Sequence, residues 1–534
     1  MLKLLVRVRL TSIFNAMFRQ SMRRDGRKSK ATKILLAVAF LYLGFCLLAL
    51  IGILCYMIAG ALANAGLGWL YHAVVGLMAV GLCFMGSVFL AQSQIFQARD
   101  NELLLSMPVP PRTIVASRLL SFLLLNYLYT AIVMAPAAVV YATVMAPGAL
   151  FYIGYAVGFL LLPLLSMTFT CAIGYLITLL TSRMRRKNLV TGVAMIVFFL
   201  AFLFLYMNLT NYAMALIENG AAIGDAFRRA LPPFYCFGMG AEGSPLYIVL
   251  TAAWCALPFL LVYVLLSRSF QKLATTNRGA AKIKYVAREM HVKSPRAALL
   301  QKELGRIFGM PLYLFNCAIG GALALVLGIV LLIKGPDLIQ SFAALYGMGS
   351  ADMLIPFLLI AASFCAAMTC TSAPSISLEG PYLWILKANP VSTGDLFFSK
   401  VMANILIGAV PLLLADVCIL IALPMGTANA VLFVVLPLLV QILIALLGLT
   451  LNLMMPRFDW VSAASVVKQS GSVMGTVFGG LGLIALPTLA YALWLRHVLS
   501  FAQFGLLACL LLALACAALI LYLCRGGRRR FEAL

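Results

Sequence analysis

The stretch Val431–Leu453, VLFVVLPLLVQILIALLGLTLNL, decides the fold class because it holds no charged residue and is long enough to cross a bilayer as one helix. Barrel strands would instead be segments of about ten residues with strict alternation. Similar apolar stretches recur along the 534 residues, of which 64% are hydrophobic and 10% charged. Soluble proteins carry about 25% charged residues. The sequence therefore predicts an all-α polytopic membrane protein.

Apolar windows between polar breaks predict twelve transmembrane helices in two groups of six. We expect four parts: a cytoplasmic segment with an amphipathic helix (1–33), a first six-helix repeat (34–266), a basic cytoplasmic linker with a second amphipathic helix (267–311), and a second repeat with a basic tail (312–534). The windows are Ile34–Ile58, Leu70–Phe89, Leu119–Val144, Phe151–Leu180, Leu189–Met207 and Tyr247–Leu266, then Leu312–Ile333, Met353–Thr371, Val401–Met425, Val431–Leu453, Ser472–Leu495 and Phe501–Leu523.

The orientation of these spans follows from the basic residues, which are retained on the cytoplasmic side. All but four of the 39 Lys and Arg residues fall on the side of the N-terminus; the exceptions are Arg228, Arg229, Lys334 and Arg496. We therefore expect both termini to be cytoplasmic, in a bacterial cell membrane. This distribution and attraction to anionic lipids account for the net charge of +24, so nucleic acid is not an expected partner.

Three markers recur in the same order in both groups and indicate an internal duplication. Each group is preceded by an amphipathic stripe, typical of a helix lying on the lipid surface. The loop after the second span carries Pro-Val and then a basic residue at the same spacing, and the fourth span contains LPLL. The stripes are Leu10, Ile13, Phe14, Met17 and Phe18, and Leu300, Leu304, Ile307 and Phe308; the loops run Pro108–Arg118 and Pro390–Lys400, and LPLL precedes Arg183 and Arg457.

Catalytic and energy-supplying motifs are missing from the sequence. A phosphate-binding G-x-x-x-x-G-K-[ST] loop needs a Gly-Lys dipeptide, which does not occur, and neither HExxH nor paired intramembrane aspartates are found. We expect no enzyme activity and no cofactor on this chain. Asp416 is the one clearly intramembrane ionisable residue; it is either a neutral, hydrogen-bonded residue or a substrate or ion contact. His72, His291 and His497 are expected to be interfacial or solvated.

The loops around Glu102 and Glu379 are the most distinctive polar features. Glu102–Met107 suits a helical turn that ends near Pro108, because the residue before proline disfavours the α region. In the second loop an aromatic stretch follows Glu379, and Ser392 with Asp395 suits a helix cap. Each loop would form a short, stiff, partly apolar projection on the cytoplasmic face. The alternative is a plain reversing loop with a basic stop signal.

At these residues the chain resembles the membrane subunits of type-2 ABC exporters, in particular the fused, Ecs-like double permeases of Gram-positive bacteria. The strings NELLLSMPVPPRTIVASR and LEGPYLWILKANPVSTGDLFFSK look like two copies of the family's coupling element. The resemblance implies that each loop docks into a separate ATP-binding subunit, in two copies, which would hold ATP and Mg. By position the docking residues are Glu102, Pro108 and Arg118, and Glu379, Pro390 and Lys400.

The two copies of this element are not equivalent. When the prolines are aligned, Gln97 falls opposite Glu379, and Glu102 falls opposite Trp384, so the acidic residue that couples in the first half stays open. The family also has short re-entrant elements between the fifth and sixth spans. Ile217–Pro245 suits such an element, whereas Arg496–Ser500 is too short.

Three functions follow as hypotheses. The first is an exporting permease subunit driven by a separate ATPase. The second is an ion-coupled secondary transporter with the same six-plus-six plan, and Asp416 is the only residue that supports it. The third is a membrane scaffold or lipid-handling factor without transport. The substrate is not identified by the sequence: a lipid-like molecule, a peptide and a hydrophobic small molecule all suit the apolar spans.

Overall fold

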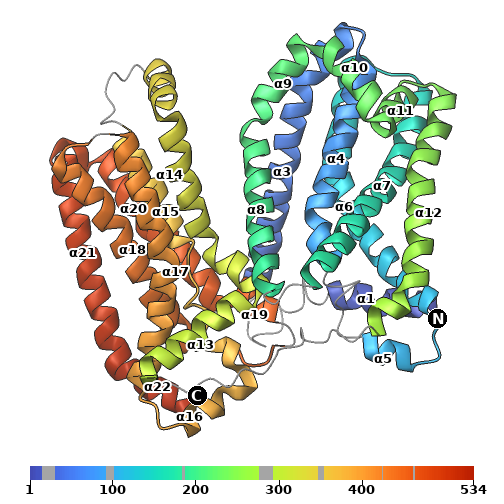
Figure 1. The fold of residues 1–534 in the computed structure, drawn as a ribbon. Coiled ribbons are helices and arrows are strands. Elements are labelled where there is room, and N and C mark those ends of the chain that lie inside the picture. The colour runs from blue at the N-terminus through green and yellow to red at the C-terminus, as the bar shows by residue number, and fades with distance from the viewer. Residues whose placement is uncertain are drawn as a thin grey trace. The chain divides into compact units, whose positions relative to one another are not determined.

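The computed structural model describes residues 1–14, 30–91, 101–182, 187–275, 293–346, 354–423, 425–460 and 463–534. All regular elements in these ranges are helical, and eleven helices are long and apolar enough to cross a membrane (Figure 1). The chain divides into two compact units: Met1–Arg185 with Phe204–Ile283, and Arg186–Leu203 with Lys284–Leu534. Several predictions fall on residues or side chains outside the described set: Leu10, Ile13, Phe14, Met17, Phe18, Gln97, Arg183 and His291.

The first unit packs its helices around a core formed mainly by α4, α6 and α7. The short helices α1 and α5 lie at one end of this unit, and α9, α10 and α11 lie at the other end (Figure 1). Its helices are α1 (Leu2–Phe14), α3 (Lys30–Asn64), α4 (Gly68–Ala91), α5 (Asn101–Ser106), α6 (Pro111–Met145), α7 (Ala149–Ser182), α9 (Leu209–Glu218), α10 (Gly220–Ala230), α11 (Pro232–Ala241) and α12 (Pro245–Thr275).

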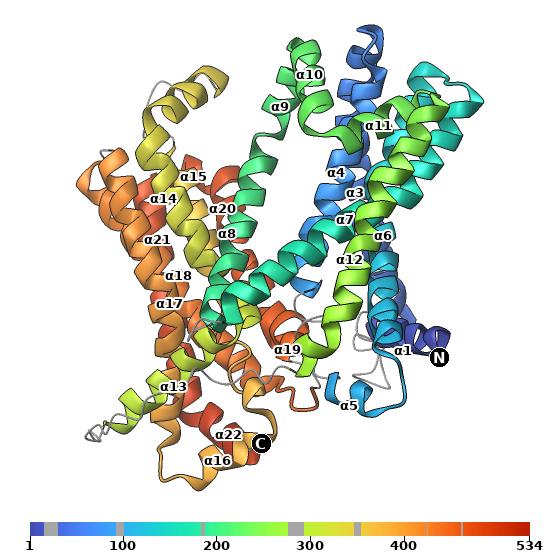
Figure 2. The ribbon, with the colours of Figure 1, turned by 45° about the vertical axis from the view of Figure 1, so that its right-hand side comes forward.

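The second unit is built around α14, α17 and α18, and α13, α16 and α22 lie together at one of its ends (Figure 2). Its elements are α13 (Pro295–Gly309), α14 (Pro311–Tyr346), α15 (Ile355–Ala367), the 3-10 turn η4 (Ser377–Tyr382), α16 (Leu383–Ala388), α17 (Thr393–Ala422), α18 (Thr427–Met454), α19 (Ala463–Gln469), α20 (Gly471–Leu493), the 3-10 turn η5 (Leu495–His497), α21 (Phe501–Tyr522), the π-helical turn η6 (Leu523–Gly527) and α22 (Arg528–Ala533).

Helix α8 (Lys187–Met207) spans the division, and its N-terminal part belongs to the second unit. The Asn188 amide donates to the carbonyl of Gly309 at 2.7 Å, and the Phe199 and Phe315 rings meet edge to face with centroids 5.7 Å apart. A Cβ on Gly192 would come within 2.9 Å of Leu314, so glycine permits this close approach. The fifth span of the first half is therefore packed against the start of α14.

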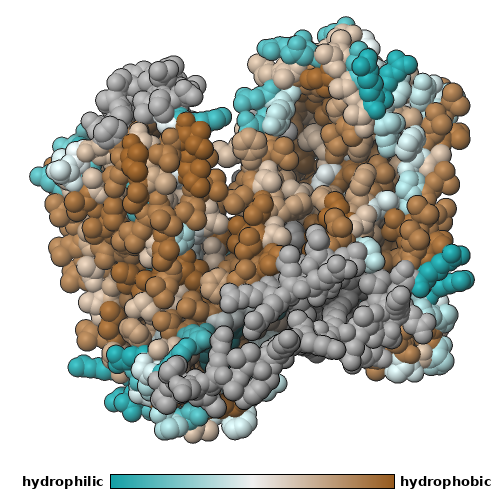
Figure 3. All heavy atoms as spheres, viewed as in Figure 1, coloured by the Kyte–Doolittle hydropathy of each residue, from teal (hydrophilic) through white to brown (hydrophobic). Residues whose placement is uncertain are grey.

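Several helix contacts occur in both units. The interfacial helix touches the third span in each (α1 with α6, α13 with α17), and so does the first span (α3 with α6, α14 with α17). The second span packs on the fourth (α4 with α7, α15 with α18), and the third also touches the fourth (α6 with α7, α17 with α18). Each unit exposes a hydrophobic surface along its helices, with hydrophilic side chains gathered toward their ends (Figure 3).

All twelve predicted windows contain helix, but the eighth is interrupted. Within Met353–Thr371 the structure describes only α15, Ile355–Ala367, which is shorter than the roughly 20 residues that a transmembrane helix needs. The chain then continues as a buried, non-helical segment from Thr369 to Ile376. The predicted re-entrant segment Ile217–Pro245 holds the short helices α10 and α11, and its re-entry into the membrane stays a prediction; at the corresponding place in the second unit only the short turn η5 occurs.

Candidate functional site

The second loop is a short helix on a buried base. Ser392 caps α17 as predicted, since its hydroxyl accepts from the Asp395 amide at 3.1 Å. In η4 and α16, which precede this cap, Leu383 is buried, but Tyr382 and Trp384 are 67% and 65% exposed, and Ile385 is exposed as well. This loop therefore presents an aromatic and aliphatic surface at the end of the unit, as the predicted projection requires.

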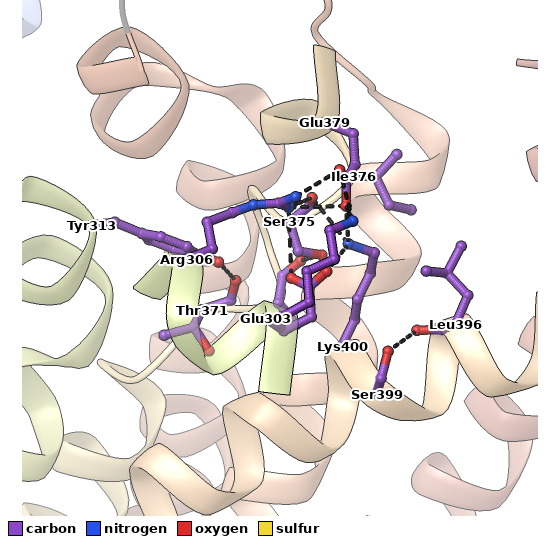
Figure 4. A network of polar contacts seen from close by, with 12 residues as sticks. Glu303, Arg306, Tyr313, Thr371, Ser375, Ile376, Glu379, Leu396, Ser399 and Lys400 are labelled. Carbon is purple, nitrogen blue, oxygen red and sulfur yellow. Dashed lines mark hydrogen bonds and ion pairs between the residues drawn. The ribbon is translucent and has the colours of Figure 1, made fainter. Parts of the chain in front are cut away.

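Beneath this surface lies a cluster of five charged side chains: Lys302, Glu303, Arg306, Glu379 and Lys400. Figure 4 labels four of them, Glu303, Arg306, Glu379 and Lys400. Glu379 is only 4% exposed and accepts from Arg306 Nη2 at 2.6 Å and Nη1 at 2.9 Å, a bidentate pair. Lys400 Nζ lies 3.0 Å from Glu379 and 2.8 Å from Glu303. We call these five residues the charge cluster.

The charge cluster joins three elements that are distant in sequence. Helix α13 supplies Lys302, Glu303 and Arg306, η4 supplies Glu379, and α17 supplies Lys400. The carbonyl oxygen of Ser375 accepts from Lys400 at 3.2 Å and from Arg306 at 3.4 Å, which attaches the non-helical segment to the same charges. Because charged side chains are buried only when they are paired, this arrangement holds the base of the loop in one geometry.

The cations keep Glu379 ionised. Burial alone would raise the pKa of Glu379, but Lys400, Arg306 and Lys302 outweigh burial and hold that pKa well below its ordinary value. Burial lowers the pKa of Lys302, and the neighbouring charges of Arg306 and Lys400 lower it further. Glu379 has the opposite effect and raises this pKa, but the net shift is downward. The cluster contains three cations and two acids, so both carboxylates are compensated.

Three buried amides hold the non-helical segment that leads into the loop. Asn452 accepts from the backbone amides of Ile376 and Ser377 at 2.8 and 3.0 Å. Asn404 accepts from the amide of Thr371 at 3.0 Å, and Gln441 donates to the carbonyl of Thr369 at 3.4 Å. Buried backbone groups outside a helix need such partners. A movement of the loop would therefore carry α17 and α18 with it.

The structure brings some of the predicted site residues together and separates others. Glu379 and Lys400 are in direct contact, whereas Pro390 is exposed and lies outside the charge cluster. Glu379 and Lys400 face α13 of the same chain, so the part of this loop accessible to a partner is its exposed residues, among them Tyr382, Trp384 and Ile385. A substitution of Glu379 would consequently disturb folding as well as any docking.

Sequence reasoning missed the three charged residues of α13. It placed Leu300, Leu304 and Ile307 on an apolar stripe, and all three are at least half-buried, but Phe308 is exposed. Glu303 lies on the same buried face, one helical turn from Ile307. A glutamate in the middle of an apolar stripe was the available signal, since a buried glutamate requires a partner.

The first loop has a different construction. Helix α5 is held by apolar contacts, with Leu104 and Val109 buried against Ile114 and Val115. Pro108 is exposed and Arg118 is buried like its counterpart Lys400, while the side chain of Glu102 lies outside the described residues. Leu103 and Met107 are exposed apolar side chains of this loop.

Two other predicted polar residues lie within the spans. Asp416 is buried in α17, and neither carboxylate oxygen has a hydrogen-bond partner among the described residues, which argues against the hydrogen-bonded alternative. The prediction that His72 is interfacial or solvated is wrong: it is fully buried among Tyr71, Tyr141, Phe151 and Tyr155, with ring centroids 4.3 to 5.9 Å away. His497 is exposed, as predicted.

The family model described as "Membrane protein of 12 TMs" matches residues 27–525. The chain therefore belongs to this family of multi-pass membrane proteins. Its description agrees with the twelve helical windows, of which α15 is the one too short to be a regular span. No curated protein and no solved structure matches the chain.

Proposed function

We propose that the chain is the permease subunit of an ABC transporter, an exporter of the bacterial cell membrane, driven by a separate ATP-binding subunit. The observation that carries this proposal is an exposed aromatic helix, α16, on a base fixed by buried ion pairs. Tyr382 and Trp384 are exposed, whereas Glu379, a few residues before them, is clamped by Arg306 and Lys400. A projection with this construction can receive force without deforming.

Force received at α16 has a defined path into the spans. The charge cluster connects the base of α16 to α13 and α17, and the amides of Asn404 and Asn452 connect the preceding segment to α17 and α18. In this proposal, closure of an ATP-driven partner displaces α16, and α13, α17 and α18 move as one group. ATP and Mg would be held by the partner, in two copies, one for each loop.

The test is co-purification with an ATP-binding subunit encoded beside this chain, followed by measurement of ATP hydrolysis. The variant Trp384→Ala should abolish capture of that subunit and the stimulation of its ATPase. Trp494→Ala is the matched control, because Trp494 is similarly exposed in the same unit next to η5. Equal capture by both variants and the wild type, at equal thermal stability, would refute docking at α16.

An ion-coupled secondary transporter is the second candidate, favoured by Asp416. A buried carboxylate without a hydrogen-bond partner among the described residues is costly, and such residues in spans commonly mark ion or proton paths. This candidate requires transport that depends on a proton or sodium gradient and not on ATP. Asp416→Asn should then abolish transport, whereas the Trp384→Ala variant should transport normally.

A further inference from the structure

The C-terminal helix α22 has one face against the second loop and another exposed. It follows the span α21 through the π-helical turn η6, and its sequence RRRFEA places one aromatic residue among charged ones. Phe531 is buried, whereas the four arginines of η6 and α22 are exposed: Arg525, Arg528, Arg529 and Arg530. The two faces have different chemistry and therefore different partners.

The buried face of α22 supports α16. Phe531 packs edge to face on Phe397 of α17, with ring centroids 5.7 Å apart. Lys387, in the last turn of α16, donates to the carbonyl of Glu532 at 3.3 Å, and its Nζ lies 5.8 Å from the centroid of the Phe531 ring. A pocket of about 220 Å³ between these elements, lined among others by Leu386, leaves room for α16 to shift.

The exposed face of α22 is strongly basic. Its charges are offset within η6 and α22 only by Glu532, which pairs with Arg528 at 2.9 Å. Arg530 donates to the carbonyl of Met454, at the end of α18, at 3.2 Å. Arg525 and Arg529 make no hydrogen bond or ion pair with another described residue. All four arginines follow the apolar helix α21, Phe501–Tyr522, so in a bilayer spanned by α21 they would lie near the lipid headgroups.

We propose that Arg525, Arg528, Arg529 and Arg530 bind the headgroups of anionic phospholipids and that this binding holds α22 against α16. Clusters of four or more basic residues immediately beyond a span are attracted to anionic lipid surfaces. A guanidinium group also matches a phosphate in geometry, as two parallel N–H groups face two oxygens. Lipid binding itself does not depend on the proposed function; only its effect on ATP-driven transport does.

The experiment uses the full-length chain, without any ATP-binding subunit, in nanodiscs of phosphatidylcholine alone or mixed with phosphatidylglycerol. Hydrogen–deuterium exchange reports on residues 383–388, and native mass spectrometry counts bound phosphatidylglycerol. We expect slower exchange in α16 when phosphatidylglycerol is present. In Arg525→Gln/Arg529→Gln this protection should disappear, and phosphatidylglycerol affinity should fall about 25-fold, since each basic residue contributes about fivefold.

Two further variants separate the parts of the proposal. Arg496→Gln, in η5, is the charge control and should behave as the wild type. Phe531→Ala should keep phosphatidylglycerol binding but lose the lipid-dependent protection of α16, because the mechanical contact is removed. The proposal is overturned if α16 exchanges equally in both lipids, or if the double variant binds phosphatidylglycerol as the wild type does. An effect of the double variant that occurs only with an ATP-binding subunit added would assign the arginines to that protein instead.

Discussion

Lys400 Nζ in α17 lies 2.8 Å from Oε1 of Glu303 in α13, and both side chains are almost completely buried. This pair joins the interfacial helix to a span, and through Glu379 it also joins both to the second loop. Buried ion pairs contribute little net stability relative to apolar residues, but removing one partner is costly. The charge cluster is therefore better understood as fixing one geometry than as stabilising the fold.

Lys400→Met should lower stability sharply, by about 3–5 kcal/mol, because Glu303 loses its closest cation and Glu379 loses one of three. Thermal unfolding of the purified chain in detergent measures the effect. Lys468→Met is the control, since Lys468 is exposed in α19 and its charge is solvated. Equal unfolding midpoints for the two variants would contradict the role assigned to Lys400.

The contribution of Glu379 to stability should not depend on pH near neutrality. The folded-state pKa of Glu379 is depressed, so its stabilising contribution is complete above its unfolded-state pKa of about 4.3 and is lost as pH falls toward the folded value. The difference in unfolding midpoint between the wild type and Glu379→Gln should stay constant from about pH 5 to 8 and shrink below about pH 4. A difference that shrinks toward alkaline pH would have the wrong sign for this account.

Asn452→Leu should destabilise the second unit by about 2–5 kcal/mol. It leaves the buried amides of Ile376 and Ser377 without an acceptor, and each unsatisfied group costs about 1–3 kcal/mol. Faster exchange of these amides in hydrogen–deuterium experiments would locate the damage. Asn389→Leu, at an exposed position after α16, is the control and should leave the amides of Ile376 and Ser377 protected from exchange.

Gly328→Ala should destabilise the contact between α14 and α17. A Cβ at Gly328 would lie 2.7 Å from Cα of Ala415, so the two helices would have to separate, at a cost of about 1–3 kcal/mol. Gly482→Ala in α20, where nothing lies within 4 Å, should instead be neutral or slightly stabilising, because alanine favours a helix. Thermal unfolding of the two variants tests this prediction. A higher unfolding midpoint for both would contradict the close approach of α14 and α17 at Gly328.

Asp416→Leu should raise the unfolding midpoint, because it removes a buried carboxylate that has no hydrogen-bond partner among the described residues. Under the proposed function, ATP-driven transport should persist in this variant. Asp459→Leu, at a position that is almost fully exposed, is the control for the loss of charge. Transport that disappears while stability rises would favour the secondary transporter.

The spans could be predicted from the sequence because bilayer thickness and apolar length constrain each other directly. Helices α17 and α18 cover the predicted windows almost end to end, and the cap at Ser392 begins α17 before its apolar window. The charge cluster could not be derived in the same way, because Lys302, Glu303 and Arg306 are distant from Glu379 in sequence. Their pairing depends on how α13 lies across the loop.

The interruption after α15 was also beyond prediction from hydrophobicity. The window Met353–Thr371 is apolar throughout, and its break is stabilised from elsewhere, by the side chains of Asn404, Gln441 and Asn452. These intramembrane amides replace the missing intrahelical partners of the backbone. His72 was misjudged for a related reason, since its position near a span end does not reveal that α6 and α7 cover it.

The position of α8 limits how the chain can be divided into fragments. Asn188 and Phe199 belong to the first repeat in sequence, but their contacts are with Gly309 and Phe315 at the beginning of the second. A fragment ending after α12 would expose the apolar flank of α8 and should aggregate when expressed by itself. The boundary between the two compact units therefore differs from the boundary between the two halves of the sequence.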